Sequence, residues 1–404
     1  MAGADSVRPH RPARGALRAA ILAVVALATT STASARDFLL GIHLGFDSAA
    51  LLAEAGGDET EAVRRHVDKA AALGARLVRI PADWRQLQPR PGDPATSFDR
   101  DRLALVVAAV RAAATHDMKA VVMLAQSPCW AVPAGLDCDS PEAIWHAPVD
   151  PHAYGRAFAF LAGEIRRAGL AATVIGWEVW NEPNSIAFWP TAKVRAGANV
   201  LVDPAAADDY VALLDAAYGA LKAADPAATV LGGSLASADT AYLARMYAAG
   251  ARYDGLAIHP YAKADPARDG VAYGPDDCGA GHDPLAPPWC FEVGVEALRA
   301  EMGRQGDARP VWFTEFGWSS SAAWGGSGSA EAQARNLADA LGIIEGWDFV
   351  PAAIVYELVD DSEKMGLLRE DLGPKPAAGA FTGFALRPGS MPDIGELRGT
   401  SGKD

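Results

Sequence analysis

The sequence has no excess of basic charge and, beyond its N-terminal segment, no long apolar run. Its 404 residues include 36 Lys and Arg against 50 Asp and Glu, a net charge of −14. Such a chain lacks the basic face that a general nucleic-acid binder needs, and its charge disfavours docking on an anionic membrane. We therefore expect no nucleic-acid partner. No stretch after residue 35 predicts a transmembrane helix.

Several catalytic signatures are also missing. The sequence contains no G-x-S-x-G elbow, which disfavours a serine hydrolase, and neither a P-loop nor an H-E-x-x-H motif. No glycine-rich phosphate turn follows the first predicted strand, which disfavours a doubly wound nucleotide-binding sheet. The pairs Asp276-Asp277 and Asp360-Asp361 are more typical of solvated loops than of calcium sites. We therefore expect no cofactor and no required metal.

The first 35 residues have the features of a secretory signal peptide. Four arginines between residues 8 and 18 precede an apolar run at 19–27, and an A-x-A cleavage site occupies 33–35. An N-terminal membrane anchor is the alternative, but the apolar run is short for a bilayer span. We expect cleavage after Ala35 and a secreted or extracytoplasmic protein that is not attached to a membrane.

Cysteine is scarce, with four residues that fall into two local pairs. Cys129 and Cys138 bracket one loop-like segment, and Cys278 and Cys290 bracket another. The spacing fits no standard zinc site, and short loops close most easily, so we predict the disulfides Cys129–Cys138 and Cys278–Cys290. Four free buried thiols are the alternative.

Short apolar runs alternate with helical patterns from about residue 38 to residue 385. Eight βα units in one chain predict a single (β/α)₈ TIM barrel at residues 36–386, followed by a flexible Gly/Pro/Ser-rich tail at 387–404. Long loops follow the third and sixth strands, at 127–149 and 262–292. The predicted strands are 38–43, 76–80, 120–124, 174–179, 229–232, 255–259, 311–314 and 353–357.

Two predicted strand ends place a carboxylate among aromatic residues. Residues 177–184 read W-E-V-W-N-E-P-N after the fourth strand, and residues 312–318 read W-F-T-E-F-G-W at the seventh. Burial beside aromatic rings raises the pKa of a carboxyl group, and two carboxyls in unlike environments can act as acid and nucleophile. Glycoside hydrolysis requires this division of roles.

The ordered pair of motifs resembles the cellulase-like clan of retaining (β/α)₈ glycoside hydrolases. The longer W-E-V-W-N-E-P-N pattern, with Phe188-Trp189 after it, is most similar to glycoside hydrolase family 39 and its exopolysaccharide-cleaving relatives. The resemblance extends to Arg79 at the second strand end, H-P-Y at 259–261 and Y-E-L at 356–358. It therefore covers nearly all of the chain after residue 35.

The resemblance implies a role for each motif residue. Glu182 is expected to be the general acid/base and Glu315 the nucleophile, and Asn181 is expected to bind the sugar 2-hydroxyl. The remaining supporting or substrate-binding residues are expected to be Arg79, His259, Tyr261, Trp318 and Tyr356. The chain departs from the clan at Tyr356, where a Trp is common, and at Gln126, where a His is expected.

Two other glutamates are weaker candidates. Glu178 lies on the same strand face as Glu182, which predicts a position about 13 Å deeper in the barrel and a role in an internal ion pair. Glu357 ends the eighth strand and is a less favoured nucleophile than Glu315. Tryptophans near strand ends are expected to line the cleft in about half of the cases: Trp84, Trp130, Trp145, Trp189, Trp289, Trp318 and Trp324.

The sequence thus predicts a secreted, retaining O-glycosyl hydrolase that acts on a poly- or oligosaccharide by double displacement. An exo-acting β-xylosidase-like enzyme is one alternative. A barrel that binds carbohydrate without cleaving it is another. The sugar, the linkage, the choice between endo and exo action and the oligomeric state are not encoded in any motif.

Overall fold

The computed structural model describes residues 38–45, 48–196, 200–262, 274–276, 289–322 and 326–387. Within this part of the chain the strands form one closed barrel in which each strand pairs with the next in parallel and β8 pairs with β1. The predicted (β/α)₈ barrel is therefore confirmed. Its strands are β1 (Leu39–His43), β2 (Leu77–Asp83), β3 (Lys119–Ala125), β4 (Val174–Val179), β5 (Val230–Ala236), β6 (Gly255–His259), β7 (Val311–Phe316) and β8 (Ala352–Val355).

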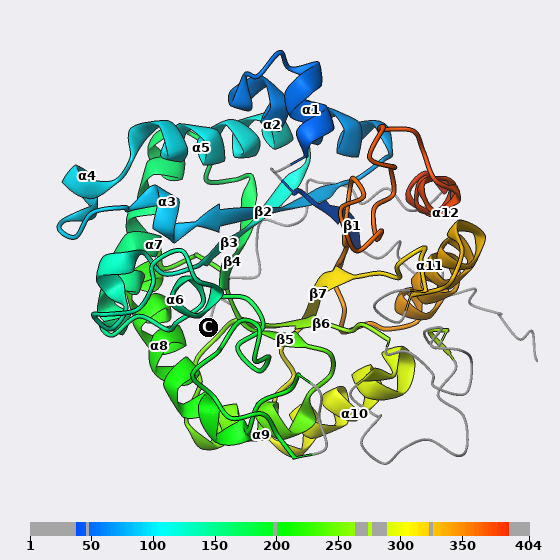
Figure 1. The fold of residues 1–404 in the computed structure, drawn as a ribbon. Helices are drawn as coiled ribbons and strands as arrows, with labels where there is room; N and C mark the ends of the chain where they lie inside the picture. The colour runs from blue at the N-terminus through cyan, green and yellow to red at the C-terminus, as the bar shows by residue number, and fades with distance from the viewer. Residues whose placement is uncertain are drawn as a thin grey trace, which may run out of the picture.

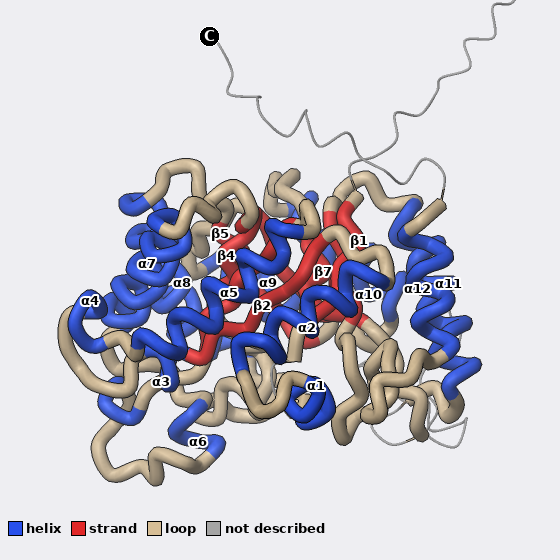
Figure 2. Tube along the Cα trace, turned by 90° about the horizontal axis from the view of Figure 1, so that it is seen from above, coloured by secondary structure: helices blue, strands red, loops and turns tan. Residues whose placement is uncertain are grey.

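The helices form a ring around the strands (Figures 1 and 2). The helices that fill this ring are α2 (Glu59–Ala72), α5 (Arg100–Thr115), α7 (Pro151–Arg167), α8 (Ala207–Ala224), α9 (Thr240–Ala248), α10 (Phe291–Arg304), α11 (Ala330–Glu345) and α12 (Pro376–Ala385). Short helices occupy the connections: α1 (Ala49–Glu54), α3 (Trp84–Leu87), α4 (Pro94–Ser97), η1 (Cys129–Ala131), α6 (Pro141–Ile144) and η2 (Pro204–Ala206).

Three of the helices begin at residues whose side chains cap them. The carboxylates of Asp99 and Asp150 accept backbone N–H groups at the starts of α5 and α7, and the Ser329 hydroxyl does the same for α11. Gly74 follows α2 with φ of 92°, a conformation that favours glycine. These local signals fix where each helix starts, and so where each strand returns to the barrel.

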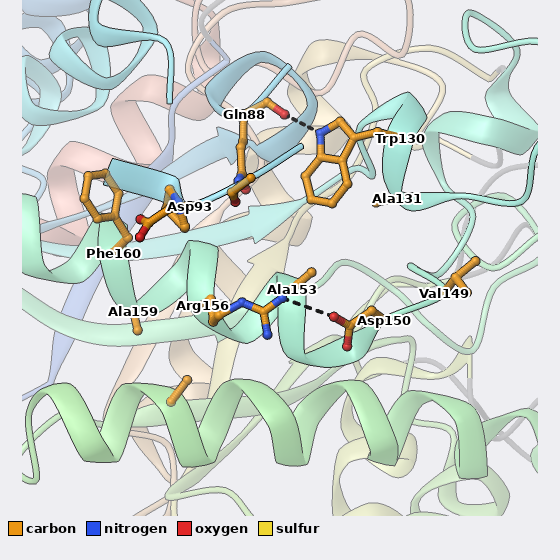
Figure 3. Close-up of a pocket in the computed structure, with 13 residues that line it drawn as sticks. Gln88, Asp93, Trp130, Ala131, Val149, Asp150, Ala153, Arg156, Ala159 and Phe160 are labelled. Carbon is orange, nitrogen blue, oxygen red and sulfur yellow. Dashed lines mark hydrogen bonds and ion pairs between the residues drawn. The ribbon is translucent and has the colours of Figure 1, made fainter. Parts of the chain in front are cut away.

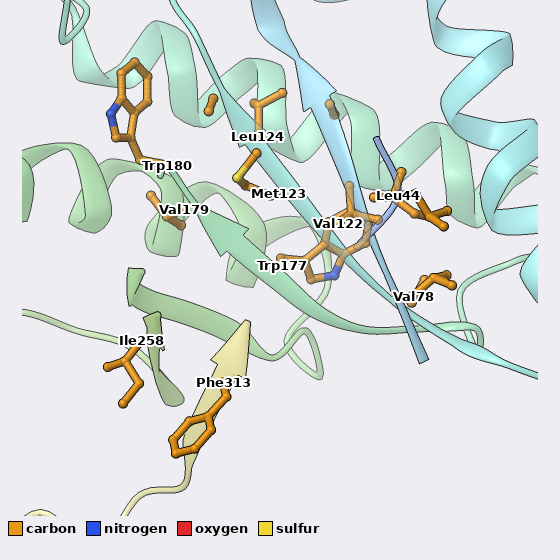
Figure 4. Close-up of a cluster of buried hydrophobic side chains, with 14 of the residues drawn as sticks. Leu44, Val78, Val122, Met123, Leu124, Trp177, Val179, Trp180, Ile258 and Phe313 are labelled. Atoms are coloured by element: carbon orange, nitrogen blue, oxygen red, sulfur yellow. The ribbon is translucent and has the colours of Figure 1, made fainter. Parts of the chain in front are cut away.

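Side chains of the strands alternate between two apolar cores. The outer core lies between strands and helices and includes Val78, Val122 and Trp177, which Figure 4 shows on β2, β3 and β4. A smaller inner core fills the barrel and includes Val121 and Trp312. Because both faces of each strand are buried, the strands read as continuous apolar runs in the sequence.

Irregular pairing changes which residues face the barrel interior. The register shifts between Phe313 and Phe316 of β7, and both of these rings pack outward against Phe291 of α10. The two residues between them, Thr314 and Glu315, both face inward. A β-bulge of this kind re-aims a side chain, and here it turns a carboxylate toward the interior.

The loop after β3 contains the predicted disulfide between Cys129 and Cys138, whose Cα atoms are 5.2 Å apart. The second predicted pairing involves Cys278, which lies outside the described residues and stays a prediction. The predicted signal peptide at 1–35 also lies outside them, as does the tail after residue 387. In the part of the chain that the structure describes, no helix is both long and apolar enough to span a bilayer.

Candidate active site

Glu182 is presented by a sharp turn directly after β4. The backbone takes positive φ at Trp180 (69°) and at Glu182 (41°), and the Glu182 N–H donates to the Ser234 carbonyl at 3.0 Å. The fully buried Asn184 side chain then pairs with the backbone of Ala236, accepting from its N–H at 2.8 Å and donating to its carbonyl at 3.0 Å. The Asn-Glu-Pro-Asn segment is thereby fastened to β5.

Glu315, on β7, is held by residues of two other strand ends. Arg79 of β2 donates from Nη1 to Glu315 Oε1, and the Tyr261 hydroxyl donates to Glu315 Oε2 at 2.8 Å. Arg79 also donates from Nη2 to Asn181 Oδ1 at 3.0 Å. The structure therefore brings together four of the residues predicted from the sequence, and it links Glu315 to the segment that carries Glu182.

His259, at the end of β6, lies between the two glutamates. Its Nδ1 is 2.9 Å from Glu182 Oε1 and 3.6 Å from Glu315 Oε2, while its Nε2 is 3.1 Å from Thr314 Oγ1. One carboxylate oxygen of Glu182 and one of Glu315 lie within 4.8 Å of each other and of the imidazole. The imidazole is fully buried, so water screens its electrostatic interaction with the carboxylates only weakly.

The predicted depth of Glu178 is wrong. Its Oε1 lies 3.7 Å from His259 Nε2, so one imidazole touches both Glu178 and Glu182. The strand ends at Val179 and the backbone turns at Trp180, which folds the Glu182 side chain back toward the barrel. The predicted ion pair is present: Glu178 Oε2 accepts from Arg79 Nε at 2.6 Å, and both side chains are fully buried.

The two glutamates have opposite pKa shifts. Burial raises the pKa of Glu182, against the opposing hydrogen bond of His259. Burial alone would also raise the pKa of Glu315, but the charges of His259 and Arg79 outweigh it and lower that pKa. Burial works against a charged His259, yet the carboxylates of Glu315, Glu178 and Glu182 raise its pKa to about 9. At neutral pH the imidazole is therefore protonated.

A hollow of about 500 Å³ opens beside this group of charges. His43 and Met123, which both contact Arg79, line it together with Tyr356 and Gln126. The rings of His43 and Tyr356 lie 5.0 Å apart. Tyr356 and Gln126, where the chain departs from the clan, therefore share one hollow.

Two polar residues of this region were missed by sequence reasoning. His43 ends β1, and a polar residue closing an apolar strand was an available signal. Burial and then the charge of Arg79 lower its pKa to about 3, so it is neutral. Glu363 lies in the loop after β8, where burial and the nearby Asp361 and Glu315 raise its pKa to about 7. No sequence pattern marks Glu363.

Three of the seven tryptophans near the predicted strand ends are core residues. Trp84, Trp189 and Trp318 are 0%, 1% and 3% exposed, and Trp318 packs against Phe291 of α10. Trp84 and Trp189 belong to the half that does not line the cleft, because their rings pack against Tyr154 of α7 and Tyr210 of α8. Trp318 likewise offers a substrate little surface. Trp324 lies outside the described residues.

The same three side chains, Glu182, His259 and Glu315, are the group best placed to hold a metal ion in the described part of the chain. The donor set fits a metal poorly. The imidazole is protonated and the Arg79 guanidinium already contacts Glu315, so a cation would meet two positive charges. The arrangement suits proton transfer between carboxyls better than metal binding.

A closed parallel barrel with two largely buried glutamates at the ends of β4 and β7 is the architecture of a glycoside hydrolase of the cellulase-like clan. The sequence comparison agrees, since residues 50–343 match the family model described as Cellulase (glycosyl hydrolase family 5). The match covers most of the chain, and the chain therefore belongs to this family. No protein with a curated record matches the chain in sequence.

Solved structures of similar fold come from this family and from family 39. A GH5_18 variant from Streptomyces cattleya in complex with Manβ1-4GlcNAc has 19% identity and a TM-score of 0.61, with 88% of this chain and 83% of that chain covered. A GH39 β-xylosidase from Caulobacter crescentus has 19% identity and a TM-score of 0.57, with 86% and 70% covered. At these identities the likeness establishes the fold alone.

Proposed function

We propose that the protein is a retaining glycoside hydrolase in which Glu315 is the nucleophile and Glu182 the general acid/base. The observation that carries this proposal is the pair of buried carboxyls with oxygens within 4.8 Å and opposite pKa shifts. Retaining enzymes hold their carboxyl groups about 5–5.5 Å apart, whereas inverting enzymes leave room for a water, with about 6.5–9.5 Å between them. The separation here supports retention.

In the first step Glu315, kept ionised by Arg79, Tyr261 and His259, attacks the anomeric carbon. Glu182 gives its proton to the leaving oxygen, so the glycosidic bond breaks as the glycosyl ester forms. In the second step Glu182, now a carboxylate, takes a proton from water, which attacks the same carbon and releases the sugar. Asn181, held by Arg79, is placed to bind the sugar 2-hydroxyl.

Azide rescue tests the two roles separately. Glu182→Ala removes the proton donor and should slow ordinary glycosides about 10²–10⁴-fold, while an aryl glycoside with an acidic phenol keeps its first step. Azide should then release a glycosyl azide of retained configuration. Glu315→Gly removes the nucleophile, so azide should give the opposite anomer. The same anomer from both variants, or nucleophile behaviour in Glu357→Ala, would contradict the assignment.

The substrate panel follows from the chemistry of the site and from the neighbours. The Streptomyces cattleya structure contains Manβ1-4GlcNAc and the Caulobacter crescentus protein is described as a β-xylosidase, so aryl β-mannosides and β-xylosides belong in the panel. Neutral poly- and oligosaccharides fit an acidic chain better than anionic ones. Product lengths from a polymer would separate endo from exo action.

We also propose that residues 1–35 are a signal peptide and that the enzyme acts outside the cytoplasm. The arginine-rich start, the apolar run and the A-x-A site support this. Expression with the full leader followed by N-terminal sequencing of the exported protein should identify residue 36 as the first residue. An exported protein that retains residues 1–35 would contradict the proposal.

A further inference from the structure

A second hollow, of about 840 Å³, lies on the outside of the barrel between α4 and α7 (Figure 3). Its lining includes Trp130, Phe160, Arg156, Asp93 and Asp150, and none of the catalytic residues. We call it the α7 groove. Its volume is in the range of ligand pockets, which is about 300–1,000 Å³.

Trp130 forms a fixed aromatic wall of the α7 groove. Its Nε1–H donates to the Gln88 carbonyl at 2.8 Å, and its ring meets the Trp84 ring at 83° with ring centroids 5.5 Å apart. Figure 3 shows the ring directed into the groove. Because its polar atom already has a partner and its position is set, the ring face can receive apolar C–H groups without further ordering.

The rim of the α7 groove carries charges of both signs. Arg156 Nη2 donates to Asp150 Oδ2 at 3.1 Å, and these side chains are 59% and 54% exposed. Asp93 adds a second exposed carboxylate. Mixed, water-accessible charges neither attract a polyanion nor select a polycation, but each is a strong hydrogen-bonding partner for hydroxyl groups.

An exposed apolar surface completes the α7 groove. Val149 is 68% exposed, more than any other large hydrophobic residue in the described part of the chain, and the small side chains of Ala131 and Ala153 leave room beside it. An exposed apolar patch that is rimmed by polar groups marks a binding surface more often than an apolar patch without such a rim. Apolar faces edged with hydroxyls are the chemistry of a neutral glycan.

The α7 groove lies one short helix away from the hollow beside the catalytic pair. Gln88, directly after α3, lines the groove, whereas Gln86 and Leu87 of α3 line the hollow. A polymer that leaves the hollow across α3 therefore meets the groove next. We propose that the α7 groove is a second, non-catalytic binding site for a neutral polysaccharide, which holds the polymer near the active site.

The identity of this ligand rests on the proposed function, so binding is measured apart from hydrolysis. Affinity electrophoresis in soluble β-glucan, galactomannan and arabinoxylan would compare the parent with Arg156→Ala and Trp130→Ala. Arg252→Ala is the matched control, since Arg252 is 55% exposed and pairs with Asp215 at 3.1 Å away from the groove. Thermal unfolding of each variant checks the fold.

We expect Arg156→Ala and Trp130→Ala to weaken binding of at least one polymer about 3- to 10-fold and to raise KM for it similarly. Turnover of a small aryl glycoside should stay at the parental value, as should all properties of Arg252→Ala. If Trp130→Ala fails to fold, Arg156→Ala decides alone. The groove proposal would be overturned if Arg156→Ala bound every polymer as tightly as the parent, or if the parent bound none. Azide rescue tests the catalytic proposal separately.

Discussion

At the scale of single residues, the opposite pKa shifts of Glu182 and Glu315 set the pH dependence of activity. The proposed mechanism needs Glu315 ionised and Glu182 protonated, so kcat/KM should be bell-shaped between the lowered pKa of Glu315 and the raised pKa of Glu182. Activity falls below the first as Glu315 gains a proton, and above the second as Glu182 loses its proton.

Tyr261→Phe tests which glutamate forms which limb. The variant removes a hydrogen bond of 2.8 Å to the Glu315 carboxylate, which raises the pKa of Glu315 and should move the acid limb to higher pH. The basic limb should move much less. Tyr247→Phe is the control, because that hydroxyl donates to Asp307 at 2.6 Å. A shift of the basic limb alone would show that Glu315 does not form the acid limb, and would contradict its proposed role as nucleophile.

How much of the site the sequence predicts also depends on single residues. The predicted site residues come together because the carboxyl ends of parallel barrel strands meet at one face. They are Arg79, Asn181, His259, Tyr261 and the glutamates. The sharing of the His259 imidazole by Glu178 and Glu182 could not be predicted from strand spacing. It arises from the turn after β4, just as the inward direction of Glu315 arises from the bulge in β7.

At the scale of elements, the buried pair of Arg79 and Glu178 ties β2 to β4. Loss of one partner leaves a buried charge, so Glu178→Gln should lower the free energy of unfolding toward the lower end of about 3–5 kcal/mol, because Glu315 still pairs with Arg79. Denaturant unfolding measures this. The exposed pair of Arg245 and Asp208 is the control, and Asp208→Asn should cost much less stability, because water screens the two charges.

The same pair makes stability depend on pH. Arg79 outweighs burial and lowers the pKa of Glu178 from 4.5 to about 2 in the folded protein. A depressed pKa stabilises the fold above the ordinary value and loses this contribution as pH falls through the folded value. The parent should therefore lose more stability than Glu178→Gln as pH falls from 4.5 to 2. Equal losses would show that the pair contributes nothing.

At the scale of the whole molecule, the hydrophobic periodicity of the sequence predicts the barrel but not the packing of the loops at its rim. All eight predicted strands are present, and those at Val174–Val179 and Gly255–His259 have the predicted bounds. Several others run further, as β5 does to Ala236, because the buried residues beyond the apolar run are small or polar. The packing of rim tryptophans depends on contacts distant in sequence, which periodicity does not report.

The Cys129–Cys138 disulfide should stabilise the rim and not the barrel. It closes a loop with a sequence separation of 9. The double variant Cys129→Ser/Cys138→Ser should therefore lower the free energy of unfolding by less than about 3 kcal/mol. Hydrogen exchange should speed up in residues 127–149 and stay unchanged in β2 to β4. Exchange that rises equally in the strands would show that the bridge supports the whole fold.

The loop at 127–149 has a consequence for redesign of the enzyme. Its hydrogen bonds in the described chain run within the loop or to the region around α3, as Ser127 to His146 and Trp130 to Gln88 do, and none reaches the buried charges around His259. The loop meets the segment that carries Glu182 through packing instead, because Trp145 lies against Trp180 and Phe188 with ring centroids 6.2 and 4.7 Å apart. Grafting a different loop onto the end of β3 should therefore change which glycans are recognised and leave the reaction itself unaltered, provided that the new loop keeps Trp145.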